Sequence, residues 1–374
     1  MNDSMISLRD VTKVFGDGSP AVGHLSLDIE RGETVVLVGP SGCGKTTTMR
    51  MINRLIEPTS GAIEIDGRDA LGQDPVQLRR SIGYVIQSIG LIPHRRVADN
   101  IAMVPDLLGW DEKKITARTK ELVEMFDLDT ELMDRYPAEL SGGQRQRVGV
   151  ARALAADPPV MLMDEPFGAV DPIVRARLQD QFLDIQQELK KTIVFVTHDI
   201  DEAIKMADRI AILNKGGRIE QYATPEEILR APANEFVKSF VGSERGLKRL
   251  ALISVAEIET ERGPVVGPDA RRDEVLAEID RGGFGWTSVV ADGELLGWID
   301  SDAMEKATDA ASAGPRPFSA YVTSESSLRQ ALDSIVTSRT NVAVVLEDGQ
   351  RYKGILTLER ISREITNANS QTPE

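Results

Sequence analysis

The segment Gly39–Thr46, which reads GPSGCGKT, constrains this chain more than any other feature. It fits the pattern G-x-x-x-x-G-K-[ST] and lies between a strand pattern, Thr34–Val38, and a helical pattern, Thr47–Leu55. Glycines at these positions let backbone N–H groups surround β- and γ-phosphates, and the helix dipole adds positive potential. Lys45 supplies a positive charge and Thr46 a hydroxyl for Mg²⁺. The alternative is a glycine-rich turn without a ligand. Such a turn does not require a strand, Lys45, Thr46 and a helix in this order, so the sequence favours a phosphate-binding loop.

Short β-branched runs alternate with amphipathic segments over the first 243 residues. Because these runs are apolar on both faces, they predict a mostly parallel sheet covered by helices, which is an α/β fold. The predicted strands are Thr34–Val38, Gly83–Ile86, Val160–Met163, Thr192–Val196 and Ile210–Leu213. Between Gln87 and Pro158 the pattern is helical, notably in Lys113–Phe126 and Gly142–Ala156, and predicts a helical subdomain over about 88–158.

Two carboxylates, Asp164 and Glu165, follow the predicted strand Val160–Met163. In a parallel sheet the carboxyl end of such a strand lies beside the phosphate loop, where ligands bind. Asp164 is placed to hold Mg²⁺ through water, and Glu165 to polarise an attacking water. A solvated acidic pair is the alternative, and the phosphate loop upstream favours the catalytic interpretation. His198 follows the strand Ile193–Val196, where it is either structural or a contact to a γ-phosphate.

A second anion site is predicted at Leu140–Gln144, which reads LSGGQ and precedes a helical pattern. Ser141 is typical of an N-cap, and the two glycines expose N–H groups at a helix N-terminus. With this motif the chain resembles the ATP-binding-cassette (ABC) ATPases. In that family two subunits form a head-to-tail dimer, and each ATP is held between the phosphate loop of one subunit and the LSGGQ segment of the other.

The resemblance covers residues 5–243 and implies a P-loop NTPase cassette fold with ATP and Mg²⁺ as cofactors. It implies that Glu165 is the general base, that His198 contacts the γ-phosphate, and that Phe15 stacks on adenine. The expected nucleotide-binding residues are Phe15, Gly39, Pro40, Ser41, Gly42, Cys43, Gly44, Lys45, Thr46, Thr47, Gln87, Ser141, Gly142, Gly143, Gln144 and Asp171. The expected metal-binding residues are Thr46, Gln87 and Asp164.

Three flanking segments narrow the resemblance to the ATPase subunits of bacterial quaternary-amine importers, which take up glycine betaine, carnitine or choline. They are Met51–Gly61, Leu78–His94 and Asp164–Pro172. The likeness implies a membrane permease, an extracytoplasmic binding protein, and a peripheral location at the cytoplasmic face of the inner membrane. It also implies that the permease docks on Ile89–Asn100, which could otherwise be an ordinary buried loop.

Two alternative functions are also compatible with an ABC ATPase. One is import of another small polar solute, such as an amino acid. The other is a soluble cassette that acts on nucleic acid or ribosomes, and such proteins usually carry two cassettes or a coiled-coil insertion, which this chain lacks. A net charge of −15 argues against a nucleic-acid partner.

Apolar runs and cysteine usage set the expected compartment. The longest apolar runs, such as Val342–Leu346, are far shorter than the ~20 residues of a membrane span. The first ten residues lack the apolar segment of a secretory signal, and one cysteine, Cys43, permits no internal disulfide. These features predict a cytoplasmic chain that does not cross the bilayer.

Residues 244–374 contain an internal repeat. Val275–Ile279 resembles Ala331–Ile335, and Gly297–Asp300 resembles Gly354–Thr357, with offsets of 56 and 57 residues. Two helix–strand–turn–strand units follow, over about 250–309 and 316–366. The Ala-, Ser-, Gly- and Pro-rich segment Ala310–Pro317 is typical of a linker between them. This α+β module resembles a tandem pair of CBS motifs, which regulate transport in the quaternary-amine importers.

The two repeat ends depart from the CBS pattern Gly-apolar-apolar-[Ser/Thr]-x-x-Asp, whose last aspartate binds ribose. The first has Asp300 at the hydroxyl position and Ala303 at the aspartate position, while the second keeps Thr357 and has Arg360 at the aspartate position. An ordinary adenosine ligand is therefore not favoured. Arg360 suits a phosphate-rich regulator such as a cyclic dinucleotide. The alternatives are a purely structural dimerisation module and sensing of ionic strength through a local basic patch against anionic lipid, although the net charge of −7 of residues 244–374 argues against a broadly basic face.

Overall fold

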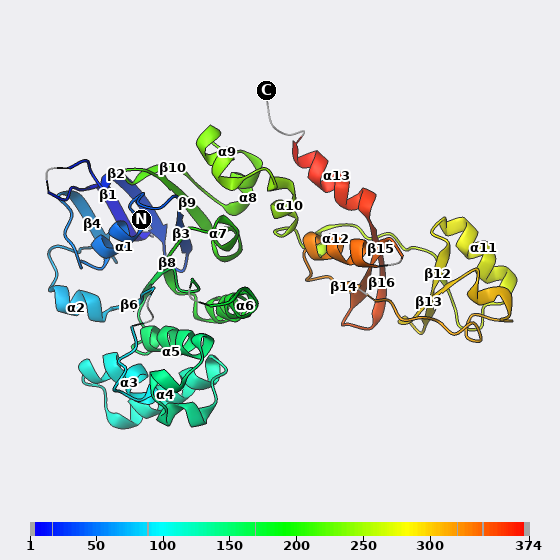
Figure 1. Ribbon diagram of the computed structural model, residues 1–374, viewed down its shortest axis with the longest axis horizontal. Helices are drawn as coiled ribbons and strands as arrows, with labels where there is room; N and C mark the ends of the chain where they lie inside the picture. Colours follow the sequence, from blue (N-terminus) through cyan, green and yellow to red (C-terminus); the bar gives the residue numbers. More distant parts are fainter. Residues whose placement is uncertain are drawn as a thin grey trace. The chain divides into compact units, whose positions relative to one another are not determined.

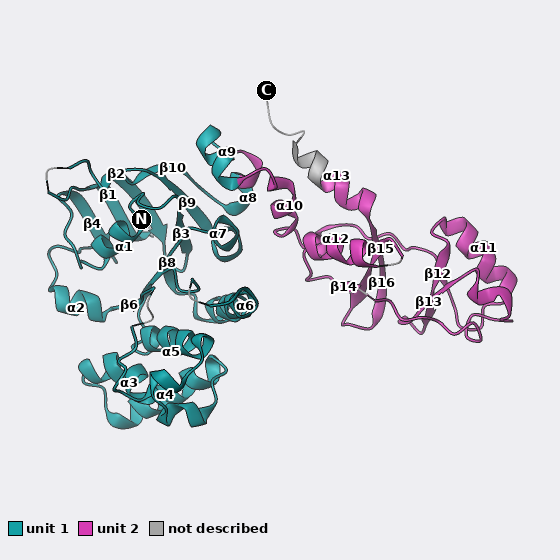
Figure 2. Cartoon of the chain, viewed as in Figure 1, with its two compact units in different colours: residues 1–228, 232–241 teal, residues 229–231, 242–374 magenta. Residues whose placement is uncertain are grey.

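A computed structural model describes residues 4–16, 18–87, 90–168, 170–319, 321–338 and 340–369, with side chains described up to residue 364. The chain divides into two compact units (Figure 2). Unit 1 comprises residues 1–228 and 232–241, and unit 2 comprises residues 229–231 and 242–374. Figure 1 shows the elements of each unit.

Unit 1 is built around a six-stranded sheet whose strand order is β10-β9-β3-β8-β7-β6. All neighbours are parallel except β9 and β10. The strands β3, β7 and β8 are buried along their whole length, as the continuous apolar runs predict. The bounds are β3 Thr34–Val38, β6 Ile82–Val85, β7 Val160–Asp164, β8 Thr192–Thr197, β9 Arg209–Asn214 and β10 Arg218–Ala223.

A second, antiparallel sheet packs on the first and was not predicted. Its order is β2-β1-β4-β5, with bounds β1 Ser4–Lys13, β2 Val22–Glu30, β4 Ser60–Ile65 and β5 Arg68–Asp69. The burial of β2 alternates along the strand because one face is solvated, so this sheet has no continuous apolar run to reveal it. Leu8 of β1, Leu37 of β3 and Met49 share one core between the two sheets.

Helices surround the sheets and form a separate layer below β6 in Figure 1. All residues from 90 to 158 are described, and they contain helices and no strand, which agrees with the predicted helical subdomain. The helices of unit 1 are α1 Lys45–Ile52, α2 Pro75–Arg80, α3 Val97–Leu107, α4 Glu112–Met125, α5 Gly142–Leu154, α6 Pro172–Leu189, α7 Ile200–Met206, α8 Pro225–Arg230, whose last two residues belong to unit 2, and α9 Glu235–Val241, with short 3-10 turns at Thr130–Asp134 and Pro137–Glu139.

Unit 2 contains the predicted repeat as one six-stranded sheet of order β11-β12-β13-β16-β15-β14. Each repeat supplies a helix, a strand, a turn and a second strand, and the two repeats meet where β13 pairs with β16. The bounds are α10 Arg245–Leu250, β11 Val265–Val266, α11 Arg272–Gly282, β12 Trp286–Ala291, β13 Glu294–Asp300, β14 Tyr321–Thr323, α12 Leu328–Thr337, β15 Val342–Glu347, β16 Arg351–Thr357 and α13 Leu358–Asn369.

The segment Ala310–Pro317 is not the spacer that its composition predicts. Ala310 is fully buried in the core of the first repeat, and its N–H donates to the carbonyl of Ala270. Arg316 exchanges two backbone hydrogen bonds of 2.9 Å with Trp298. The small residues therefore permit tight turns against the sheet. The linker prediction is wrong because a composition rich in small residues also allows close packing against the first repeat.

Two glycines at equivalent positions of the repeats are expected to be essential to unit 2. Gly297 and Gly354 have φ values of 149° and 153°, and a Cβ on either would lie 2.4 Å from a carbonyl oxygen, that of Arg316 or of Glu261. Gly354→Ala should therefore destabilise unit 2 by about 3 kcal/mol or more. Urea unfolding followed by the fluorescence of the unit 2 tryptophans measures this loss.

The control for this prediction is Gly267→Ala, because Gly267 has no left-handed φ and a Cβ there meets no atom within 4 Å. That variant should unfold at the urea concentration of the unaltered chain. If Gly354→Ala unfolded at the same concentration as Gly267→Ala, the close backbone approach between the repeats would be wrong.

Candidate functional site

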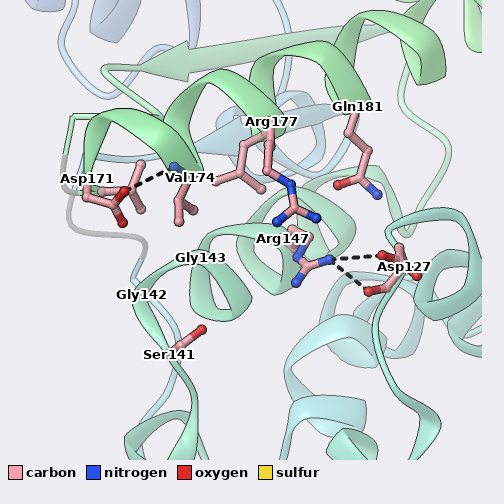
Figure 3. A pocket seen from close by; sticks show the side chains of 11 residues that line it. Asp127, Ser141, Gly142, Gly143, Arg147, Asp171, Val174, Arg177 and Gln181 are labelled. Carbon is pink, nitrogen blue, oxygen red and sulfur yellow. Dashed lines mark hydrogen bonds and ion pairs between the residues drawn. The ribbon is translucent and has the colours of Figure 1, made fainter. Parts of the chain in front are cut away.

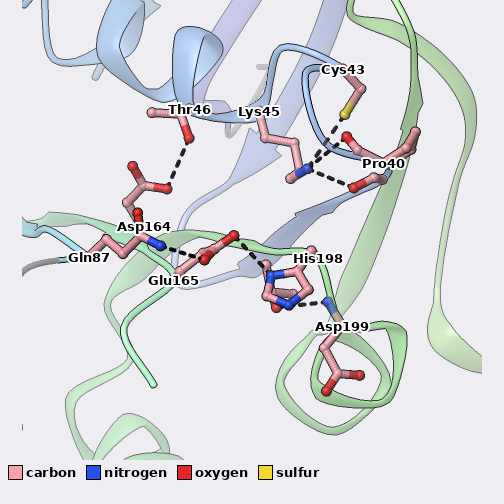
Figure 4. A network of polar contacts seen from close by, with 11 residues as sticks. Pro40, Cys43, Lys45, Thr46, Gln87, Asp164, Glu165, His198 and Asp199 are labelled. Atoms are coloured by element: carbon pink, nitrogen blue, oxygen red, sulfur yellow. Dashed lines mark hydrogen bonds and ion pairs between the residues drawn. The ribbon is translucent and has the colours of Figure 1, made fainter. Parts of the chain in front are cut away.

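The predicted phosphate loop forms the turn between β3 and α1, and Gly44 is the N-cap of that helix. The ammonium of Lys45 is turned back into this loop, where it donates to the carbonyl oxygens of Gly39 at 2.7 Å and Pro40 at 3.2 Å (Figure 4). The buried Cys43 contributes its Sγ at 3.7 Å. Only 7% of Lys45 is exposed, so a positive charge lies inside a ring of backbone groups. This arrangement suits a polyphosphate.

Asp164 ends β7 beside the first residues of α1. Its Oδ1 accepts a hydrogen bond of 3.2 Å from the Thr46 hydroxyl, although the two residues are far apart in the sequence (Figure 4). Burial raises the pKa of the Asp164 carboxyl, and the neighbouring charge of Glu165 raises it further, against the opposing hydrogen bond from Thr46. A desolvated carboxylate beside a hydroxyl is a donor set that Mg²⁺ accepts, with phosphate oxygens and water as its other ligands.

Asp164→Asn is expected to stabilise the protein while it removes activity. Because the pKa is raised in the folded state, deprotonation of Asp164 costs folding free energy, and this cost sets in as the pH rises above the ordinary value of 3.8. The neutral amide removes the cost at pH 7, so the midpoint of urea unfolding should rise. Below pH 3.8 the difference should vanish. ATP hydrolysis should be lost because the amide is a poor ligand for Mg²⁺.

Asp309→Asn is the control of opposite sign. Hydrogen bonds from the Ser312 backbone and hydroxyl lower the pKa of Asp309, so its charge stabilises the folded state above the ordinary carboxyl pKa. That substitution should lower the unfolding midpoint at pH 7. A lowered midpoint for Asp164→Asn as well would show that burial does not destabilise the Asp164 charge.

Glu165 lies between two of the predicted site residues. Its Oε2 accepts a hydrogen bond of 2.9 Å from Gln87 Nε2, and its Oε1 lies 3.0 Å from Nδ1 of His198 (Figure 4). The residue adopts a left-handed φ of 45°, and its N–H donates to the Val196 carbonyl of β8. The ends of strands β6, β7 and β8 thus bring two predicted residues, Gln87 and His198, to the carboxylate of a third, Glu165, which is positioned to accept a proton.

The LSGGQ segment forms a capped helix start. Ser141 Oγ accepts from the N–H of Gln144 at 3.2 Å, and the Gln144 side chain accepts from the N–H of Ser141 at 2.8 Å. Gly142 and Gly143 line a cavity of about 450 Å³ between α5 and α6 (Figure 3). Its lining residues include none from Gly39–Thr46, so the predicted second anion site is separate from the phosphate loop within one chain.

Asp171 borders the same cavity as the N-cap of α6, where its Oδ1 accepts from the N–H groups of Ile173 and Val174 (Figure 3). Phe15 lies beyond β1 with 53% of its surface exposed, and the Lys13 ammonium lies 5.2 Å from its ring centroid. An exposed ring is what stacking on adenine requires. The roles of Phe15 and Asp171 in nucleotide binding stay predictions.

Sequence reasoning missed Arg50 and Tyr84, which interact electrostatically with Asp164. Burial and the charge of Asp164 raise the pKa of Tyr84, while its hydrogen bond to Arg50 opposes this shift. The positive charge of Arg50 also favours the ionised form of Asp164. Arg50 lies four residues after Thr46 on one helix face, and that spacing was the available signal.

The two repeat ends of unit 2 are engaged within the chain. Asp300 Oδ2 lies 2.9 Å from Arg316 Nη1, and Asp300 Oδ1 accepts from the N–H of Ala303. Arg360 Nη2 lies 3.4 Å from Glu259, and the Arg360 N–H donates to Thr357 Oγ1 at 3.3 Å. A ligand at either end would compete with these ion pairs. The phosphate-rich regulator at Arg360 stays a prediction.

Known proteins resemble the chain along nearly its whole length. The ABC transporter family profile matches residues 22–168, and the CBS domain profile matches residues 315–367. The osmoprotectant import ATP-binding protein OsmV of Salmonella typhimurium is 45% identical over 374 residues, with 98% of each chain covered. The glycine betaine/carnitine/choline transport ATP-binding protein OpuCA of Bacillus subtilis is 59% identical over 261 residues, covering 70% of this chain and 68% of OpuCA.

A solved structure confirms the predicted cassette fold. The ATP-binding cassette MJ0796, a dimer in a post-hydrolysis state bound to ADP and Pi, covers 59% of this chain and 99% of its own. The sequence identity is 34% and the TM-score is 0.53. In the part of the chain that the structure describes, no helix is both long and apolar enough to cross a membrane.

These matches confirm the predicted resemblance and the α/β cassette followed by an α+β CBS module. Cassettes of this family bind and hydrolyse ATP and work as dimers with membrane permease components. The phosphate loop, the acidic pair and the LSGGQ helix are the segments predicted to take part in that reaction. The chain belongs to the ABC transporter family, as an ATP-hydrolysing subunit that carries a C-terminal CBS domain.

Proposed function

We propose that this chain hydrolyses MgATP to power the import of a quaternary ammonium osmoprotectant, such as glycine betaine, choline or carnitine, through a membrane permease. The observation that carries the hydrolytic role is the carboxylate of Glu165, held between Gln87 and His198 beside the Thr46–Asp164 pair. The substrate class rests on the relatives OsmV and OpuCA, whose names record osmoprotectant import and transport of these three amines.

In the proposed mechanism ATP first binds to the phosphate loop. Backbone N–H groups of Gly39–Thr47 and the Lys45 ammonium bind the β- and γ-phosphates, and Phe15 stacks on adenine. Thr46, Asp164 and Gln87 would hold Mg²⁺, which would neutralise negative charge on the phosphates when bound. Glu165 then accepts a proton from the attacking water, and His198 contacts the γ-phosphate and orients the Glu165 carboxylate.

The second anion site implies a homodimer. Ser141, Gly142, Gly143 and Gln144 of one subunit would contact the ATP bound to the phosphate loop of its partner, with Asp171 at the shared boundary. Closure of such a dimer excludes water from the nucleotide, which strengthens every electrostatic contact inside. ATP binding and hydrolysis would close and reopen the dimer and drive the permease at the cytoplasmic face of the inner membrane, with an extracytoplasmic binding protein delivering substrate.

Uptake after an osmotic upshift tests this proposal. Cells that lack this chain, with and without a plasmid copy, are given radiolabelled glycine betaine, choline, carnitine or an amino acid. We expect the plasmid copy to restore uptake of at least one quaternary amine by tenfold or more, with no effect on the amino acid. Restored amino-acid uptake alone, or no restored uptake, would overturn the proposed substrate class.

A further inference from the structure

The loop Gly90–Arg96 begins three residues after Gln87 and leads into α3. Its tip is exposed at Pro93, His94 and Arg95, and it forms no helix or strand. This loop lies within the segment expected to receive the permease. Its shape is fixed from inside the molecule by side chains that sequence reasoning did not single out.

Asn100 of α3 is the first of these side chains. It has no exposed surface, and its amide makes four hydrogen bonds to the loop backbone. Oδ1 accepts from the N–H of Ile92 at 2.7 Å, while Nδ2 donates to the carbonyls of Ile92 at 3.2 Å, Arg95 at 3.0 Å and Arg96 at 3.0 Å. A buried amide that is hydrogen-bonded at both its oxygen and its nitrogen fixes the conformation of the loop around it, because a shift of the loop would leave the amide unpaired in the interior.

Arg152 holds the other end of the loop. It lies in the last turn of α5 and is half-buried, and its Nη1 donates to the carbonyl of Gly90 at 2.6 Å. The same helix starts at the LSGGQ segment, where Ser141 is the N-cap. An α-helix of this length is a stiff rod of roughly 20 Å, so it links the loop to the second anion site mechanically.

Two further contacts attach the end of the loop to the helical subdomain. Arg96 Nη1 lies 2.6 Å from the Asp134 carboxylate, and the N–H of Val97 donates to the carbonyl of Arg135 at 2.9 Å. The partners named for this loop therefore lie on α3, on α5 and on the 3-10 turn Thr130–Asp134 with the residue after it. All three belong to the helical layer of Figure 1, and the phosphate loop lies on the sheet.

We infer that Asn100 and Arg152 are positioning residues that join the loop Gly90–Arg96 rigidly to the helices that carry the LSGGQ segment. A force applied to the loop then reaches Ser141 through α5 instead of being absorbed by loop bending. Its consequence for import rests on the proposed function, in which the permease docks on this loop. The rigid attachment itself is a property of the isolated chain and is tested there.

Spin labels measure the attachment. One label at His94→Cys reports the loop tip, and a second at Lys113→Cys on α4 reports the helical layer; both positions are exposed, whereas the native Cys43 is buried. In the otherwise unaltered full-length chain the 94–113 distance distribution should be narrow, with and without MgATP. Asn100→Leu and Arg152→Met, which keep the side-chain size, should each broaden it at least twofold.

Arg118→Met is the matched control. Arg118 is also an arginine of the helical layer that donates to a backbone carbonyl, that of Leu154 at 3.2 Å, but it does not contact the loop. It should leave the distribution narrow. Asn100→Asp, which keeps Oδ1 and removes the Nδ2 donors, replaces Asn100→Leu if the latter fails to fold.

Two results would overturn the inference: a narrow 94–113 distribution in both Asn100 and Arg152 variants, or a broad one in the unaltered chain. A second measurement separates positioning from catalysis. ATP hydrolysis by the isolated variants should stay within about twofold of the unaltered chain, while uptake per ATP in the complete transporter falls at least tenfold. If no variant or unaltered chain supports uptake, the proposed function fails and the distance measurement still decides the attachment.

Discussion

Glu165→Gln is expected to reduce the rate of ATP hydrolysis by about 10²- to 10⁴-fold while ATP still binds. The substitution keeps the shape of the side chain and its place between Gln87 Nε2 and His198 Nδ1, which lie 2.9 and 3.0 Å from the carboxylate oxygens. An amide cannot accept the proton of the attacking water. Phosphate release at saturating MgATP gives the rate, and titration with a fluorescent ATP analogue gives the affinity.

The same variant should accumulate as an ATP-bound dimer on gel filtration, because closure no longer leads to hydrolysis. The control is Glu33→Gln, a half-buried carboxylate before β3 that contacts the Glu30 N–H rather than the site. That variant should hydrolyse ATP at the unaltered rate. Undiminished hydrolysis by Glu165→Gln would exclude Glu165 as the general base.

Lys45→Met is expected to weaken ATP binding by about 10²- to 10³-fold, which corresponds to about 3–4 kcal/mol. The ammonium is almost fully buried and is held by the carbonyls of Gly39 and Pro40 inside the phosphate loop. Methionine fills a similar volume but brings no charge to the phosphates. Titration calorimetry with MgATP measures the loss.

The control for the lysine is Lys205→Met on α7, which removes a lysine that pairs with Asp180 outside the site. Its ATP affinity should match that of the unaltered chain, which would show that loss of one positive charge outside the site does not by itself weaken ATP binding. If Lys45→Met bound ATP within threefold of the unaltered chain, the phosphate loop would not be the main nucleotide-binding element.

The parts of the fold that depend on continuous apolar runs follow directly from the sequence. The predicted strand Thr34–Val38 has the same bounds as β3, in which all five side chains are buried, as in a strand covered on both faces. The antiparallel sheet was missed because β1, β2 and β4 carry polar residues on their solvated face. The start of α1 was placed two residues late, at Thr47, because its N-cap, Gly44, belongs to the phosphate loop and has no capping side chain to mark the helix start at Lys45.

The site residues were predicted from their order along the chain, whereas their contacts depend on strand order. Gln87, Glu165 and His198 meet because β6, β7 and β8 are neighbours, and no local pattern fixes that arrangement. Asn100 was missed for a different reason. In the sequence it is one polar residue in an amphipathic helix. Its role depends on hydrogen bonds to the loop backbone, which form only when the loop is folded against α3.

Transport and hydrolysis measured in the same proteoliposomes test the central claim most directly. Vesicles contain the permease and either the unaltered chain or Glu165→Gln, with the binding protein and labelled glycine betaine, choline or carnitine outside and MgATP inside. We predict accumulation of at least one amine together with ATP hydrolysis for the unaltered chain, and the loss of both for Glu165→Gln. Accumulation with Glu165→Gln, or hydrolysis by the unaltered chain without accumulation of any of the three, would contradict the account.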